Sequence, residues 1–219
     1  MDREEQRLAR KARRQQAKRG RILDEARRLL EEGGPTALTM SALAEAADTS
    51  TPTLYYYFAS KEAVADALAI QMLEEETGVM MAALESASGG VASVVAIMEA
   101  RLRHYVAHPA AFRVLYLAMM DVGISQATLE QHVYPLSAQV MRELEDHLRA
   151  DQAAGRVHAS LRPREFANVA FFTVQGILAT LIGMAQAGGT LRFGAEVLLA
   201  EAVATVRRAA TPPGSPSGS

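Results

Sequence analysis

The side chains best suited to contact another molecule are concentrated in residues 38–58. This stretch reads LTMSALAEAADTSTPTLYYYF and holds several hydroxyl groups, one proline and three consecutive tyrosines. Hydroxyl groups can bind phosphate oxygens, and both hydroxyl and apolar groups can contact the base edges of a DNA duplex. The chemistry that this stretch offers is therefore recognition of DNA, provided that the chain holds these side chains on one surface.

The same stretch is predicted to form two short helices joined by a tight turn. Thr39 is a suitable N-cap for a helix over residues 40–47, and Ser50 is one for a second helix that starts near residue 51. Ser60 is a suitable N-cap for the longer helix that follows. A helix-turn-helix needs a small residue at the helix crossing, apolar residues at helical spacing and a turn residue that tolerates a positive φ. Ala44 and Asp48 meet the first and last conditions. The apolar residues are Leu43, Ala47, Leu54 and Phe58.

The second helix is expected to have one inward face and one outward face. Leu54 and Phe58 lie at i and i+4 and should point into the protein, so the other side chains face the DNA. The N-terminal end of such a helix enters the major groove, and we therefore expect base-edge contacts from Thr51, Pro52 and Tyr55. The alternative is that the tyrosines only pack as core or rim aromatics.

The run from Thr39 to Lys61 resembles the DNA-binding signature of the TetR family of transcriptional regulators. The matching positions are Ser50, Thr53, Leu54, Tyr55, Tyr57, Phe58, Ser60, Lys61 and Glu62. Two positions depart from the usual pattern, because Asp48 stands where glycine is usual and Thr49 where valine is usual. Aspartate is among the few residues besides glycine that enter the left-handed region at low cost. The departures are therefore compatible with the motif.

The resemblance implies a function and further DNA contacts. It implies a transcriptional repressor that binds a palindromic operator as a homodimer and is released by a small-molecule effector. Ser41 is expected to reach a base or a phosphate, and packing is a close alternative for Tyr57. The side chains assigned to phosphates by the resemblance are Thr53, Tyr56, Tyr57 and Lys61, and Ser50 is a further candidate for DNA contact.

A basic cluster precedes this motif. Eight Lys and Arg residues and no acidic residue lie between Arg7 and Arg21. Such a cluster can neutralise DNA phosphates. Beside a helix-turn-helix, we interpret it as an arm that reaches the minor groove or flanking phosphates, with Arg14 and Lys18 among the contacts. The alternatives are a solvated terminus and an extension of the helix that carries Ile22.

The rest of the chain predicts an all-α fold. Helical spacing of apolar residues dominates, and no sustained alternation indicates strands. We expect about nine helices, with a kink at Pro135 because its ring nitrogen cannot donate a hydrogen bond. The helices after the motif are expected near residues 61–87, 91–107, 109–120, 125–153, 163–187 and 193–210.

The predicted organisation is a small N-terminal three-helix domain and a larger C-terminal helical bundle. A basic arm or helix extension covers residues 1–20, and the helix-turn-helix domain covers 21–66. The resemblance implies a ligand-binding and dimerisation domain over 67–210. Residues 211–219 are only Thr, Pro, Gly and Ser and are predicted to be disordered.

The C-terminal bundle holds the candidates for dimerisation and effector binding. Residues 166–184 are apolar nearly all round and should be buried on both sides, so homodimer contacts are expected over about 163–210. Methionine lines adaptable apolar pockets, and polar side chains can orient a ligand. Plain core packing is the alternative for each candidate, and for Arg101 a surface ion pair is the favoured role. The candidates are Met81, Met98, Arg101, His104, Tyr105, Phe112, Tyr116, Met119, Tyr134, Phe171, Phe172 and Gln175.

Composition excludes several other classes of function. The 219 residues include no cysteine, and the five histidines show no ligand spacing with carboxylates, so we expect no metal and no cofactor. No nucleophile elbow, phosphate loop or HExxH motif is present, which argues against an enzyme. No signal peptide or ~18-residue uninterrupted apolar run is present, and we expect a cytoplasmic protein without a membrane partner. The alternatives are a dimeric helical carrier of hydrophobic small molecules and an activator of the TetR type.

Overall fold

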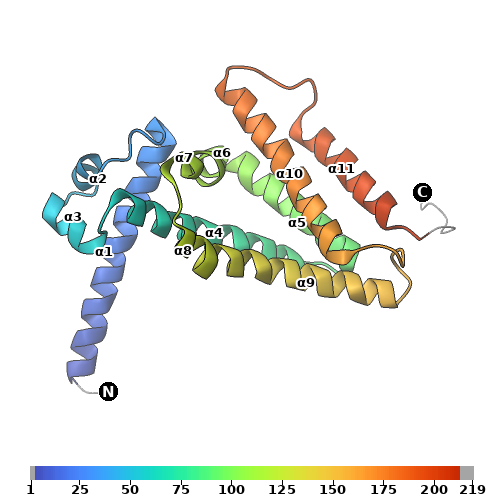
Figure 1. Cartoon of the computed structure of the whole chain (residues 1–219), viewed down its shortest axis with the longest axis horizontal. Helices are drawn as coiled ribbons and strands as arrows, with labels where there is room; N and C mark the ends of the chain where they lie inside the picture. Colours follow the sequence, from blue (N-terminus) through green and yellow to red (C-terminus); the bar gives the residue numbers. More distant parts are fainter. Residues whose placement is uncertain (1–2, 213–219) are drawn as a thin grey trace. The chain divides into compact units, whose positions relative to one another are not determined.

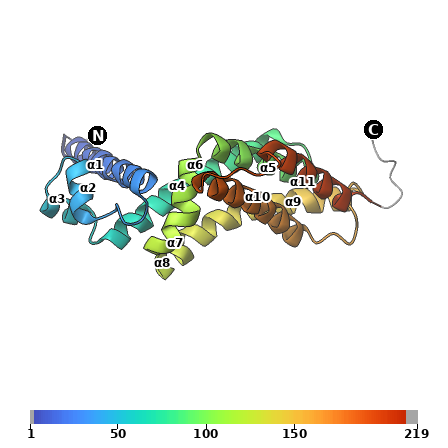
Figure 2. The same cartoon turned by 90° about the horizontal axis from the view of Figure 1, so that it is seen from above.

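A computed structural model describes residues 3–212 of the chain, and every regular element in this range is helical (Figures 1 and 2). The elements form nine continuous helical segments over these residues, which confirms the predicted all-α fold. The predicted disordered tail lies outside the described residues from 213 onward. The bounds of the α-helices are α1 Arg3–Gly33, α2 Met40–Ala46, α3 Thr51–Tyr57, α4 Lys61–Ser86, α5 Gly90–Ala107, α6 Pro109–Phe112, α7 Met119–Val122, α8 Gln126–Thr128, α9 Tyr134–Ala153, α10 Pro163–Gln186 and α11 Ala195–Ala210.

Two of the segments contain a wider π-helical stretch. One, η1, covers Arg113–Ala118 between α6 and α7, and the other, η2, covers Leu129–Val133 between α8 and α9. The second stretch ends directly before α9, and Pro135 lies in the first turn of α9. Because proline cannot donate to the carbonyl one turn earlier, the regular hydrogen-bond ladder is interrupted there, at the place where the sequence predicted a kink. The first π-helical stretch had no such signal.

The chain divides into two compact units. The first unit comprises residues 3–72 and 113–129, and the second comprises residues 73–112 and 130–212. Helix α4 supplies residues to both units. The sequence pattern did not indicate that residues 113–129 belong with the N-terminal helices.

In the first unit, α1 packs on α2 and on η1, and α2 packs on α3. The apolar stripe at the C-terminal half of α1 is buried at Ile22, Leu23, Ala26 and Leu30. Leu43 and Leu54 are also fully buried. The helix-turn-helix is therefore held to α1 by a continuous apolar core, to which each buried leucine contributes ~1.5–3 kcal/mol.

In the second unit, α5 packs against α9, α10 and α11, and α10 also packs against α9 and α11. The Asp151 carboxylate accepts a hydrogen bond from the Gly90 backbone N–H at 2.7 Å and so caps the start of α5 from α9. Here α5 approaches α9 so closely that a Cβ on Gly90 would lie 2.6 Å from the Cα of Leu148. The backbones of the two helices are therefore in direct contact at this crossing.

Helix α10 is buried on one face only. Ala167, Ala170, Val174, Leu178 and Ile182 are buried within the chain. On the opposite face, Val169 and Phe172 are 65% and 63% exposed. Among the described residues no other element covers the second face of α10, so the prediction that residues 166–184 are buried on both sides depends on the homodimer and stays a prediction.

Helix α10 is also long and apolar enough to cross a membrane by length and composition. One such helix is weak evidence, because core helices of soluble proteins have the same properties.

Candidate functional site

The two short helices α2 and α3 begin at the caps that the sequence predicted. The Thr39 hydroxyl accepts a hydrogen bond from the Ala42 N–H at 3.1 Å, and the Ser50 hydroxyl accepts one from the Thr53 N–H at 3.3 Å. The Ser50 and Thr53 hydroxyls also bond to each other at 2.7 Å. These bonds satisfy backbone donors at each helix start, which fixes where α2 and α3 begin.

The turn between α2 and α3 depends on two polar residues. Asp48 has φ 45° and is the only residue other than glycine with positive φ among the described residues. The Lys18 ammonium donates to the carbonyls of Ala47 and Asp48 at 3.0 and 3.3 Å. A cation is favourable at the C-terminal end of a helix, where carbonyl groups lack partners. Lys18 therefore stabilises the turn, and its predicted contact with DNA stays a prediction.

Helix α3 has the predicted inward and outward faces. Leu54 is buried on it, whereas Thr51, Pro52 and Tyr55 are exposed. Phe58, directly after α3, is also buried. The exposed set further includes Ser50, Thr53 and Tyr56 and, on α2, Ser41.

The tyrosines of α3 are held by contacts with α1 and with each other. Tyr56 is 71% exposed, and its hydroxyl accepts a hydrogen bond from the Gln15 side-chain amide at 3.0 Å. The rings of Tyr56 and the half-buried Tyr57 meet edge to face, with centroids 5.3 Å apart. Gln15 was not predicted to contact this site. The sequence could have indicated this contact, because Gln15 lies seven residues before the buried Ile22 and therefore on the same face of α1.

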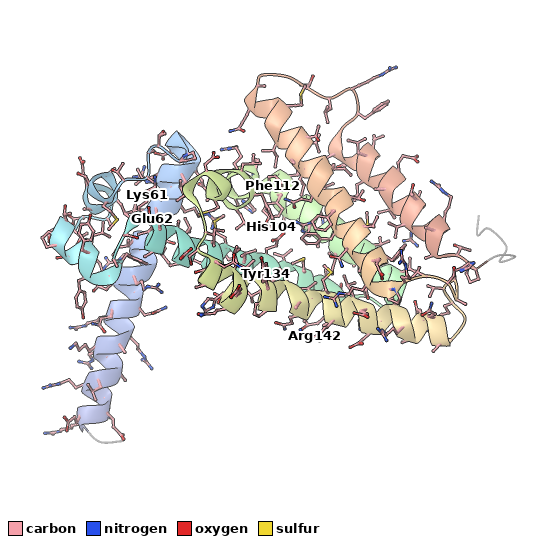
Figure 3. All side chains as sticks on the ribbon, viewed as in Figure 1. Lys61, Glu62, His104, Phe112, Tyr134 and Arg142 are labelled. Atoms are coloured by element: carbon pink, nitrogen blue, oxygen red, sulfur yellow. The ribbon has the colours of Figure 1, made fainter. Side chains whose placement is uncertain are left out.

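The residues at the start of α4 fix the end of the site. The Ser60 hydroxyl accepts a hydrogen bond from the Ala63 N–H at 3.2 Å and so caps α4. The half-buried Lys61 donates to the Pro35 carbonyl at 3.1 Å, while Glu62 is exposed (Figure 3). A hydrogen bond from Ser60, with support from the backbone and the Lys61 charge, lowers the pKa of Glu62 below its ordinary value. In this structure Lys61 connects α4 to the loop after α1.

A second cluster of polar groups lies inside the second unit. Arg101 on α5 is 0% exposed and forms an ion pair with Glu76 on α4, with Nε 2.8 Å from the carboxylate oxygen. Its guanidinium also donates to the Gln175 side chain at 2.7 Å and to the Phe171 carbonyl at 3.2 Å. The expectation of a surface ion pair for Arg101 is wrong, because the pair is enclosed by α4, α5 and α10.

The ring of Phe171 completes this cluster. The Arg101 guanidinium carbon lies 3.8 Å from the centroid of that ring, which is a cation–π contact. Glu76 was not among the predicted residues. The sequence could have indicated its burial, because Glu76 lies four residues after Met72 and four before Met80. The three residues therefore share one face of α4, and both methionines are buried. We refer to Glu76, Arg101, Phe171 and Gln175 as the buried arginine cluster.

The remaining predicted effector-binding residues fall into three groups. The buried Tyr105 and Phe112 meet edge to face with centroids 5.2 Å apart. The ring of the half-buried His104 meets that of Tyr105 edge to face, with centroids 4.7 Å apart. Tyr134 and Phe172, at 54% and 63% exposed, do not lie in a buried cluster.

The remaining candidates are divided between the two units. Met98 is buried and Met81 is half-buried in the second unit, whereas Tyr116 and Met119 belong to the first unit.

The described residues contain no group of three or more His, Asp or Glu side chains that could hold a metal ion.

Sequence and structure comparisons agree with the geometry of the first unit. Residues 22–68 match the model of the family described as bacterial regulatory proteins, tetR family. The N-terminal domain belongs to the tetR family. The matched range covers the buried half of α1, the whole helix-turn-helix and the start of α4. No curated protein matches the chain significantly in sequence.

Solved structures extend the likeness to nearly the whole chain. A protein of unknown function from Rhodococcus sp. RHA1 has 24% identity and a TM-score of 0.70, covering 89% of this chain and 95% of that chain. The regulator FadR from Bacillus subtilis, in complex with stearoyl-CoA, has 16% identity and a TM-score of 0.70, with 86% and 97% covered. The tetR-family regulator PfmR from Thermus thermophilus has 20% identity and a TM-score of 0.66, with 85% and 97% covered. The chain therefore has the fold of a tetR-family transcriptional regulator.

Proposed function

We propose that the protein is a cytoplasmic transcriptional repressor of the tetR type, and not an enzyme. It binds a palindromic operator as a homodimer, and a small-molecule effector releases it. The observation that carries the proposal is the outward face of α3, where Thr51, Pro52 and Tyr55 are exposed on a helix anchored by buried Leu54. A short helix of this kind presents its N-terminal end to the major groove.

In this proposal the candidate DNA contacts divide into two groups. Thr51, Pro52 and Tyr55 contact base edges and thymine methyl groups, which gives sequence preference. The other group binds phosphates and sets the position of the protein without reading sequence. Its members are Arg14, Lys18, Thr53, Tyr56, Tyr57 and Lys61. Ser41 contacts a base or a phosphate, and Ser50 is a further DNA contact.

The exposed face of α10 supports the homodimer. Val169 and Phe172 on α10 and Val197 on α11 are each more than half exposed, and all three are large apolar residues. Apolar side chains grouped on two neighbouring helices are typical of a surface that another protein covers. A two-fold partner would bury the same face of α10 and α11 from both copies, over about residues 163–210.

The buried arginine cluster supports an effector that acts through α4. Glu76 lies on this helix, and α4 begins at Lys61, directly after the helix-turn-helix. A ligand that competes for Arg101 or Glu76 would weaken the hold of α5 and α10 on α4. Such a ligand shifts the population between DNA-binding and non-binding states by its difference in affinity for the two.

The surroundings of the cluster favour an effector with a large apolar part. On α5 the buried Met98 and Tyr105 lie three and four residues from Arg101, and the ring of the buried Phe112 meets that of Tyr105. The B. subtilis FadR structure contains stearoyl-CoA, which joins a long acyl chain to an anionic group. We therefore propose an apolar effector with a polar or anionic end that binds near Arg101.

The experiment that tests the proposed function is selection of bound duplexes from a random library, followed by affinity measurements against salt. A repressor selects a palindrome and loses affinity steeply as salt rises, because each neutralised phosphate releases counterions. A helical carrier of hydrophobic molecules would bind an apolar dye but select no duplex. Adding long-chain acyl-CoA to the selected complex then tests the effector, and equal operator binding with and without it would contradict this class of ligand.

A further inference from the structure

Helix α1 continues far beyond the core of the first unit. It begins at Arg3, but its first buried residue is Ile22. At ~1.5 Å per residue, residues 3–21 form an exposed helical extension about 28 Å long. The sequence left a mobile arm and a helix extension open, and the described residues have the second form.

One face of this extension carries a row of positive charges. Arg7, Lys11 and Arg14 lie at i, i+4 and i+7, and Arg10 lies beside them within the same third of the helix surface. We call these four residues the basic stripe. All four are exposed, and none forms a hydrogen bond or an ion pair within the part of the chain that the structure describes. The stripe therefore projects an uncompensated positive potential into solvent.

The extension is fixed in orientation relative to the recognition helix α3. Gln15 bonds to Tyr56 on α3, and Lys18 bonds to the carbonyls at the end of α2. The Arg19 guanidinium carbon lies 4.9 Å from the centroid of the Phe58 ring. These contacts continue the apolar contacts of Ile22 toward the N-terminus of α1, which Figure 1 draws as one continuous helix. When a duplex binds α3, the extension of α1 therefore has a fixed orientation relative to that duplex.

The form of the extension decides which part of DNA it can bind. A helix with its side chains is ~10–12 Å wide, whereas the minor groove of B-DNA is ~6 Å wide. A flexible arm could enter that groove and read its width, but a helix cannot. Its arginine and lysine side chains can still reach phosphates on the outside of the duplex.

We propose that the basic stripe binds the phosphates of the duplex that flanks the operator half-site, without reading sequence. This inference rests on the proposed function, because it assumes that α3 binds the half-site. The length of the extension corresponds to about 8 base pairs at ~3.4 Å per pair, so each protomer extends its footprint by up to that length.

The test compares two duplexes and two variants. The first duplex is the selected operator with about 8 additional base pairs on each side, and the second is the operator trimmed to its selected core. The stripe variant is Arg7→Gln with Lys11→Gln and Arg14→Gln, which keeps a similar helix propensity. The matched control is Arg103→Gln with Arg142→Gln and Arg149→Gln, which removes three exposed charges from the second unit outside the proposed dimer contacts. Circular dichroism verifies that both variants keep their helix content.

The expected result is specific to the flanks. The slope of log affinity against log salt becomes shallower by about 3 per bound protomer for the stripe variant on the long duplex, because each lost phosphate contact changes it by ~0.9. On the trimmed duplex, the stripe variant and the wild type have the same slope, and the control equals the wild type on both. The wild type binds A·T-rich and G·C-rich flanks with affinities within about twofold.

Three results would overturn the inference while leaving the proposed function intact. They are an unchanged slope for the stripe variant on the long duplex, an equal loss on both duplexes, and a tenfold or greater preference for A·T-rich flanks, which a minor-groove arm would give. A wild-type protein that binds neither duplex refutes the proposed function and this inference together.

Discussion

The helix-turn-helix and the buried arginine cluster are both polar sites, but they are built over very different distances in the sequence. Each cap of α2 and α3 joins residues three positions apart. In the cluster, Arg101 is 25 residues from Glu76 and 74 residues from Gln175. The first site is exposed and ready to meet a large partner, whereas the second is enclosed and holds three helices together. A site made of local contacts can be identified from its spacing, but a site made of distant contacts needs the fold.

The largest effect is expected when the buried arginine cluster loses its cation. Arg101→Met leaves the buried Glu76 carboxylate without its ion-pair partner and should destabilise the protein by ~3–5 kcal/mol. Urea denaturation followed by circular dichroism measures this. Replacing both partners, as Glu76→Leu with Arg101→Met, should recover most of the loss, because no buried charge is left.

The matched control for this variant is Arg103→Met on the same helix. Arg103 pairs with Glu99 at the surface, so its loss should change stability by less than about 1 kcal/mol. If Arg101→Met were as mild as Arg103→Met, the distinction between an enclosed and an exposed polar site would not hold for this protein.

The next effect concerns DNA binding and not stability. Tyr55→Ala removes an exposed ring from α3 and should weaken binding to the selected operator by ~1–3 kcal/mol. The melting temperature should change little, because Tyr55 is half exposed. Electrophoretic or fluorescence titration with the selected duplex measures the affinity. Unchanged operator affinity would remove Tyr55 from the recognition surface.

A smaller effect is expected at the turn between α2 and α3. Asp48 has φ 45°, a conformation that is costly for branched side chains. Asp48→Val should destabilise the protein by ~1–2 kcal/mol, whereas Asp48→Gly should be neutral or slightly stabilising. Thermal unfolding of the two variants side by side tests this order. The reverse order would mean that the aspartate side chain, and not its backbone conformation, is what the turn requires.

The smallest effect is a change in titration at the start of α4. The folded pKa of Glu62 lies below its unfolded value, so the stability it adds is present above the unfolded pKa and is lost as the pH falls through the folded one. Ser60→Ala removes the largest cause and should raise the pKa of Glu62 toward its ordinary value. Titration of the Glu62 side-chain carbon by NMR in the wild type and in Ser60→Ala measures the shift. An unchanged Glu62 pKa would assign the lowering to the backbone and to Lys61.

The sequence predicted those features whose causes are local. The caps at Thr39, Ser50 and Ser60, the positive φ of Asp48 and the inward Leu54 all follow from residue types at fixed short spacing. The helix count was also predictable, because glycine and proline interrupt a strong helical periodicity. These are the properties that determine the fold of the DNA-binding part.

The features that the sequence did not predict depend on which helices meet. Arg101 has the sequence context of a surface residue, and only the packing of α4 and α10 against α5 shows that it is enclosed. The capping role of Lys18 requires that α1 passes the end of α2. Phe172 was a candidate for effector binding, but it lies on the face of α10 that the single chain leaves exposed.

The contact of Gly90 with α9 has a consequence for genetic studies of this protein. Any side chain at position 90 would overlap the backbone of Leu148 and His147. A library of all single substitutions should therefore show position 90 as intolerant of every replacement, with loss of function as the observed phenotype. Such a pattern resembles that of a residue that contacts DNA or effector. Measuring the amount of folded protein for each variant separates a position that preserves a helix crossing from one that takes part in regulation.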